Sequence, residues 1–222
     1  NENGGIQPVD FSNNIISGNQ AANGAGIYHI IDEGHQASAQ IPVTFENNTI
    51  TQNLSSQSES GAIWLEAPHA ILNNNNIFGN DTTYELYDNR GIGAADLDGE
   101  NNWWGTTDQA TIQAQIYDWS DDGTKQLVDY SPFLTTPDTS TPPSPPDNVA
   151  AQTGPTSIAL SWSANPESDI AGYKVHYDTD AAGYPYANST DVGNLTSYTL
   201  SSLSTATTYY TAISAYDSDG NE

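Results

Sequence analysis

One segment of this sequence carries alternating acidic residues whose types and spacing suit metal binding. In the segment DLDGEN, Asp96, Asp98 and Glu100 stand at every second position, and Ca²⁺ prefers oxygen ligands of this kind. A tight turn is the alternative, because Asp-Gly pairs are typical of turns. Both interpretations stay open here, whereas the similar segment DSDGNE at 217–222 is predicted to be a hairpin turn. We expect no required cofactor, and Ca²⁺ is the one candidate ion.

Thiol catalysis and zinc binding find little support in the residue types. The chain has no cysteine, which excludes thiol catalysis and cysteine-ligated zinc. The histidines are too scattered along the sequence to predict a zinc site. We expect strand or loop positions for all four of them: His29, His35, His69 and His176.

Aromatic residues offer another kind of site, a strip of rings that stacks on sugars. Four of them occupy apolar strand positions in the first half of the chain: Tyr28, Trp64, Tyr84 and Tyr87. Packing within the protein is the alternative, and apolar strand positions favour it. Two interpretations of these four residues therefore stay open: a strip that stacks on glycans, and rings that pack within the protein.

The charge balance narrows the class of partner. Only 3 basic residues stand against 28 acidic ones, which gives a formal net charge of −25. Such a chain repels phosphate, so we expect neither nucleic acid nor an anionic membrane as a partner. The sequence is 36% hydrophobic and 10% aromatic, enough for a folded core, and no apolar run approaches the length of a membrane span.

A repeat supplies the elements that must position these residues. The segments FSNNIISGN, FENNTITQN and LNNNNIFGN begin at Phe11, Phe45 and Leu72, and they align without gaps. The first and second segments start further apart than the second and third do, and we assign the extra residues to a surface loop at 30–42. A glycine and an apolar strand follow the first two segments, and 84–88 is the candidate third equivalent. Units this short cannot bury their own apolar faces, so they must stack on one another.

Stacking also explains the asparagine pairs. Equivalent turns placed above one another let amide side chains bond from coil to coil and satisfy buried polar groups. Asparagine also tolerates the left-handed backbone that such turns need. The predicted ladder consists of Asn13, Asn14, Asn47, Asn48, Asn74 and Asn75. With these turns, residues 1–134 resemble a right-handed parallel β-helix of the pectate-lyase-like kind.

That resemblance implies an activity to consider, since pectate-lyase-like helices often cut acidic polysaccharides with Ca²⁺ and a basic residue. The basic residues are Arg90, Lys125 and Lys174. Of these, only Arg90 lies in the coils of the predicted β-helix. An ion pair on the surface between Arg90 and Asp88 is the alternative, and we favour it.

A cap is predicted at the end of the coils, where bare strand edges would invite aggregation. The segment TTDQ has capping-box spacing, and three apolar residues after it recur at helical spacing. The cap residues are Trp103, Trp104, Thr106, Gln109, Ile112, Ile116 and Trp119. The segment also resembles the closing segment of bacterial β-helix proteins.

A second domain follows a Pro/Thr/Ser linker at 135–146. Residues 147–222 contain short alternating strands that predict a β-sandwich, with Trp162 and Tyr173 in its core and Tyr209 at the spacing of a tyrosine corner. This region resembles a bacterial fibronectin type III domain, and the sequence stops after the sixth of the seven strands expected.

The sequence therefore predicts an all-β protein: a right-handed parallel β-helix with a helix-containing cap, then an immunoglobulin-like sandwich lacking its last strand. We favour a non-catalytic structural or adhesive part of a secreted or cell-surface prokaryotic protein, with glycans, other surface proteins or copies of itself as partners. One alternative is the C-terminal region of a polysaccharide lyase or hydrolase whose catalytic coils lie upstream. Another is a subunit of an extracellular filament that assembles by strand addition.

Overall fold

The computed structural model describes residues 9–30, 42–181 and 183–222. The chain divides into two compact units, Asn1–Thr141 and Pro142–Glu222. Nearly all of the predicted loop at 30–42, together with His35, lies outside the described residues.

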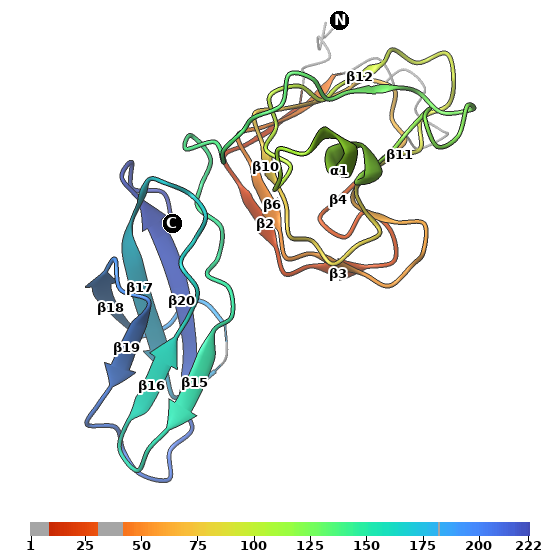
Figure 1. The fold of residues 1–222 in the computed structure, drawn as a ribbon. Coiled ribbons are helices and arrows are strands. Elements are labelled where there is room, and N and C mark those ends of the chain that lie inside the picture. The colour runs from red at the N-terminus through yellow and green to blue at the C-terminus, as the bar shows by residue number, and fades with distance from the viewer. Residues whose placement is uncertain (1–8, 31–41, 182) are drawn as a thin grey trace, which may run out of the picture. The chain divides into compact units, whose positions relative to one another are not determined.

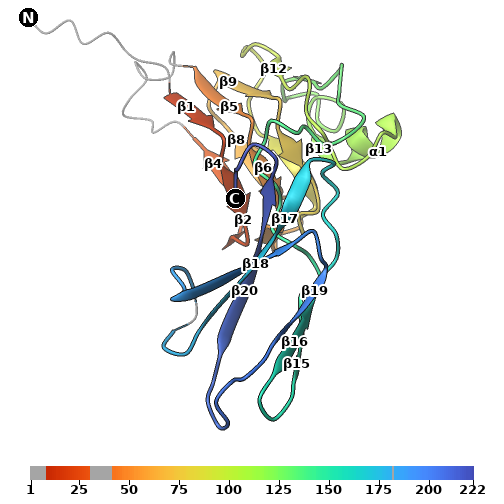
Figure 2. The same ribbon diagram turned by 90° about the vertical axis from the view of Figure 1, so that its left-hand side faces the viewer.

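The first unit is a parallel β-solenoid, as predicted, seen nearly end-on in Figure 1 and from the side in Figure 2. Equivalent strands from successive coils pair in parallel. One sheet has the order β1 (Val9–Ser12), β5 (Val43–Glu46), β9 (Ala70–Asn73), β12 (Leu97–Asp98) and β14 (Val128–Asp129). The second joins β10 (Asn76–Ile77), β6 (Thr49–Thr51) and β2 (Ile15–Ser17), and a two-stranded sheet joins β3 (Gln20–Ala21) and β7 (Leu54–Ser55). The last has the order β13 (Ile116–Tyr117), β11 (Tyr84–Asp88), β8 (Gly61–Leu65) and β4 (Ile27–His29).

The register of these sheets follows the sequence repeat. Phe45 lies opposite Phe11 on one side and Leu72 on the other. Ile50 is likewise flanked by the Ile residues at the equivalent positions of the coils on either side. Phe45, Leu72 and Ile50 are all buried in the solenoid core. Since a slip of one residue would turn such side chains out of the core, the apolar positions hold the register.

A fourth coil continues the repeat where we predicted the cap. Leu97 and Asp98 form β12, and Asn102 stands 27 residues after Asn75 and bonds to it. Trp104 lies fully buried among the core residues. Trp103 forms a parallel β-bridge with Asn76 on the preceding coil. The two tryptophans therefore belong to a coil, and the capping segment begins after them.

The helix in the cap is shorter than its apolar spacing predicts. Helix α1 (Gln109–Ala114) begins after Asp108, and the predicted capping box of Thr106 and Gln109 is wrong. Asp108 is the N-cap residue, although its side chain bonds the Thr111 hydroxyl and caps no backbone amide.

Beyond the helix, strand pairing replaces helical geometry. The Gln115 carbonyl accepts hydrogen bonds from the amides of Glu85 and Leu86, and the next two residues form β13 beside β11. Ile112 and Ile116 are buried as predicted, but Trp119 is 57% exposed. The exposed edge of β11 thus gains a hydrogen-bonding partner that a longer helix could not supply.

The first part of the predicted linker packs on the solenoid. The Asn76 side chain donates to the Asp138 carbonyl at 3.0 Å and accepts from the Asp138 amide at 2.8 Å. Asn76 also donates to the Thr141 hydroxyl at 2.6 Å. Residues 138–141 are therefore held by the solenoid.

The second unit is a sandwich of two antiparallel sheets. One has the order β15 (Ala150–Thr153), β16 (Ile158–Ser161) and β19 (Ser197–Leu200), and the other has the order β18 (Asn188–Gly193), β17 (Ile170–Asp178) and β20 (Tyr210–Asp217). Trp162 and Tyr173 are both buried, as expected, and meet edge to face with ring centroids 5.5 Å apart. Alternation along β17 buries Tyr173 and Val175 in the core, so Lys174 and His176 face outward.

Candidate functional site

One ladder of asparagine side chains runs through four coils. Asn14, Asn48 and Asn75 each donate from Nδ2 to Oδ1 of the next asparagine at 2.9–3.0 Å, and the series ends at Asn102. The same Oδ1 atoms also accept from the backbone amides of the donating residues. Each coil is therefore bonded to the next by both side chain and backbone.

The first asparagine of each pair has a different task. Asn13, Asn47, Asn74 and Asn101 have φ angles of 55–58°, in the left-handed region that asparagine tolerates better than most residues. The predicted set thus separates into turn formers and ladder members. Asn101 and Asn102 were missed, although their 27-residue offset from the preceding pair was a usable signal.

A second ladder was also missed. It joins the asparagines at the ninth repeat position, Asn19, Asn53 and Asn80. The hydrogen bonds between their side-chain amides are 3.0 and 2.9 Å long. Asn80 then donates to Glu85 Oε2 at 2.6 Å. Burial raises the pKa of Glu85 from its ordinary 4.5 to about 7, although the hydrogen bonds from Asn80 oppose that rise. The ladder therefore ends on a carboxyl group that titrates near neutral pH.

The structure gathers the predicted sugar-stacking residues into one column. Tyr28, Trp64, Tyr87 and Tyr117 are register neighbours on adjacent strands, and they alternate with core residues, so they face outward. The Trp64 and Tyr87 rings are parallel with centroids 4.2 Å apart, and Tyr87 stacks on Tyr117 at the same distance. Tyr84 meets Tyr87 and Tyr117 edge-on.

This self-stacking limits what the column can bind. Trp64 and Tyr87 are only 8% and 5% exposed, because each ring covers the face of the next. A sugar needs a free ring face, and only Tyr28, 51% exposed, is widely accessible. The packing interpretation therefore describes the middle of the column.

The candidate base Arg90 is buried, which corrects the expected surface ion pair. Its guanidinium donates through Nε and Nη2 to the two carboxylate oxygens of Asp88, both at 2.8 Å. The Arg90 side chain is 1% exposed, and Nη1 bonds the Ala95 carbonyl at 3.1 Å. Since a base must reach its substrate, the geometry gives Arg90 a structural task.

The acidic segment belongs to the fourth coil. Asp96 accepts from Gln126 at 3.0 Å, and Asp98 lies in β12. Among the residues described, no three His, Asp or Glu side chains lie close enough to hold a metal ion together. Calcium binding at Asp96, Asp98 and Glu100 stays a prediction. Of the histidines, His29 is partly buried, and its pKa is lowered by burial and by the charge of Arg90.

The sandwich contains the tyrosine corner that its sequence predicts. The Tyr209 hydroxyl accepts a hydrogen bond from the Ser204 amide at 3.0 Å. Such a bond back to an upstream backbone group is the mark of this corner in immunoglobulin-like sandwiches.

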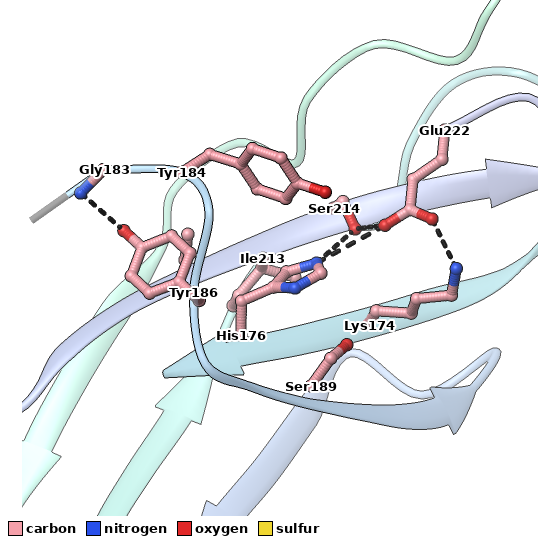
Figure 3. A pocket seen from close by; sticks show the side chains of 10 residues that line it. Lys174, His176, Gly183, Tyr184, Tyr186, Ser189, Ile213, Ser214 and Glu222 are labelled. Atoms are coloured by element: carbon pink, nitrogen blue, oxygen red, sulfur yellow. Dashed lines mark hydrogen bonds and ion pairs between the residues drawn. The ribbon is translucent and has the colours of Figure 1, made fainter. Parts of the chain in front are cut away.

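An open pocket of about 840 Å³ lies on the outer face of the sheet β18-β17-β20, and Figure 3 shows its lining. Lys174 and His176 come from β17, Ser189 from β18 and Ser214 from β20. Tyr184 and Tyr186 approach from the loop between β17 and β18, and Glu222 closes one end. Sequence reasoning did not find this pocket, because no motif joins these separated residues.

A hydrogen-bonded row crosses the pocket. The Ser214 hydroxyl donates to Glu222 Oε1 at 2.6 Å, so its oxygen is left to accept from His176 Nε2 at 2.8 Å. Glu222 also forms an ion pair with Lys174. In a serine hydrolase the acid bonds the opposite imidazole nitrogen from the serine, but Glu222 and Ser214 both approach Nε2. The row therefore suits hydrogen bonding to a ligand rather than nucleophile activation.

The fold and these sites define an all-β protein that joins a stacked solenoid to an immunoglobulin-like sandwich. The fibronectin type III family model matches residues 144–222, so the C-terminal unit is a fibronectin type III domain. Among solved structures, the FN1-FN3 domains of chicken CNTN1 align at 27% identity with a TM-score of 0.31. That alignment covers 34% of this chain and 27% of the other. The comparison with curated proteins finds no match.

Proposed function

We propose that this chain is a structural or adhesive part of a secreted or cell-surface protein, with glycans or other surface proteins as its partners. The observation that carries the proposal is the fibronectin type III domain at 144–222, a fold whose common use is in protein contacts. Among the described residues, none of the helical segments has the length and hydropathy of a membrane span.

The solenoid supports this role through its rigidity. Two asparagine ladders bond its coils in series, and buried satisfied polar networks stiffen a fold and specify one arrangement. Such a scaffold holds its outer faces in fixed register for repeated contacts. The net charge of −25 favours neutral or cationic partners over anionic ones.

The direct test is binding of the purified chain to immobilised neutral and acidic polysaccharides, and to itself, measured by surface plasmon resonance. We expect retention on a neutral polysaccharide that survives moderate salt. Tyr28→Ala tests whether the exposed ring of the aromatic column contributes. Leu127→Ala, another exposed apolar position of the solenoid, is the control.

The same samples distinguish the enzyme alternative. Lyase activity releases unsaturated sugars, which absorb in the ultraviolet, and hydrolysis releases reducing ends. Release of either product by this chain would contradict the non-catalytic proposal. Absence of binding to every polysaccharide, together with absence of self-association and of surface-protein capture on a defined array, would contradict the adhesive role.

A further inference from the structure

We propose that the pocket on the outer face of β18-β17-β20 binds one neutral pyranose unit of a glycan. This deepens the adhesive role proposed above and rests on it for the class of partner. The pocket belongs wholly to the fibronectin type III unit, and its volume of about 840 Å³ lies within the range of small-molecule sites, roughly 300–1,000 Å³.

The tyrosines supply the apolar part of the site. Tyr184 is 86% exposed, the most of any large hydrophobic residue described, so folding alone does not explain its ring. Tyr186 comes from the same loop, and its ring centroid lies 6.1 Å from that of the His176 imidazole. The Tyr186 hydroxyl accepts from the Gly183 amide at 3.2 Å. That bond orients the loop, and the Tyr184 ring projects over the polar row (Figure 3). An exposed aromatic face suits the C–H face of a pyranose ring, which is flat and apolar.

The polar row supplies both kinds of hydrogen-bonding group. Lys174 has three N–H donors, and its ion pair with Glu222 uses one of them. Glu222 accepts from Ser214 and Lys174, yet a carboxylate has about four acceptor positions. Sugar hydroxyls donate and accept at once, so they can bond such a row without displacing its internal bonds.

The charges argue for a neutral sugar. The single positive charge of Lys174 is compensated by Glu222. Asp191 lies nearby as well, since it accepts from the hydroxyl of Tyr216, and the Lys174 ammonium lies over the ring of that tyrosine. A carboxylate or sulfate on a sugar would meet these acids within a strongly acidic protein. A cationic group would meet the ammonium of Lys174. A neutral polyol incurs neither penalty.

The test is a titration of the full ¹⁵N-labelled chain with neutral methyl glycosides of glucose, galactose and mannose. Binding is monitored by the changes in the amide chemical shifts in NMR spectra. The corresponding methyl uronosides form the charged comparison. Tyr184→Leu removes the ring and keeps an apolar side chain, and Ser214→Ala interrupts the polar row. Leu195→Ala is the matched control, because Leu195 is 58% exposed on the same domain but outside the pocket.

We expect at least one neutral glycoside to shift the amides of Lys174, His176 and Ser189. Tyr184→Leu should weaken that binding by roughly tenfold, the usual effect of removing an aromatic anchor, whereas Leu195→Ala should leave it unchanged. Equal or tighter binding of the uronoside would overturn the charge argument. Unchanged binding in Tyr184→Leu, or no shift with any neutral glycoside, would overturn the site. If the chain still binds a polysaccharide in those cases, the adhesive role stands and only the pocket assignment fails.

Discussion

Replacing Glu85 by glutamine should stabilise the protein at neutral pH. Burial raises the pKa of this carboxyl from 4.5 to about 7 in the folded state. The unfolded chain therefore releases the proton at lower pH than the folded protein does, and stability falls as the pH rises between these two values. The shift corresponds to about 3 kcal/mol. A glutamine side chain at this position would resemble the protonated acid, keep an acceptor for Asn80 and lose this penalty.

The assay is urea unfolding of the native protein and Glu85→Gln, followed by tryptophan fluorescence at about pH 4 and about pH 8. At the lower pH the two proteins should be nearly equally stable. At the higher pH the variant should be more stable by on the order of 3 kcal/mol. Glu59→Gln is the control, because Glu59 is exposed and the substitution removes the same charge. An equal difference between the native protein and Glu85→Gln at both pH values would refute the reasoning, as would a less stable variant at the higher pH.

The other predictions concern single buried bonds. Asn75→Ala, in the middle of the first ladder, should cost on the order of 3 kcal/mol in urea unfolding because it leaves buried amides unpaired. Asn14→Ala, at the exposed end, should cost clearly less, and equal losses would contradict the ladder's energetic role. Arg90→Met should cost roughly 3–5 kcal/mol by leaving the buried Asp88 carboxylate without its counter-charge, and the loss should shrink at acidic pH, where Asp88 is protonated. A loss independent of pH would contradict that cause. Tyr209→Phe should cost about 1 kcal/mol through the lost corner bond, seen as a lower midpoint for the sandwich; an unchanged midpoint would show that the bond contributes nothing.

The solenoid was predictable because its register is a property of the repeat. Asparagine pairs and large apolar residues recur at equivalent positions, and stacking brings residues with the same position in the repeat together. The repeat alone therefore predicts that Asn14, Asn48 and Asn75 share one ladder, and their side chains do bond in series. Asn102 continues the same ladder by accepting from Asn75, although the tryptophans beside it are also typical of a capping segment.

The helix length and the state of Arg90 were not predictable from local pattern. Ile116 has helical spacing from Ile112, yet it pairs with β11, because an unpaired strand edge competes with helix propagation. Arg90 is next to acidic and polar residues in sequence, and only the closing of the coils around it decides that its charge is buried. Both outcomes depend on neighbours that are distant in the chain.

By itself, then, the sequence determined the all-β class, the stacked coils with their ladder and the sandwich with its tyrosine corner. Each of these follows from periodicity or from short fixed spacing, which are local properties. Only the tertiary structure decided that the aromatic column covers its own ring faces, that Glu85 ends a ladder, and that Lys174, His176 and Ser214 share one pocket. Burial and the meeting of distant strands set these features, and neither leaves a periodic trace in the order of residues.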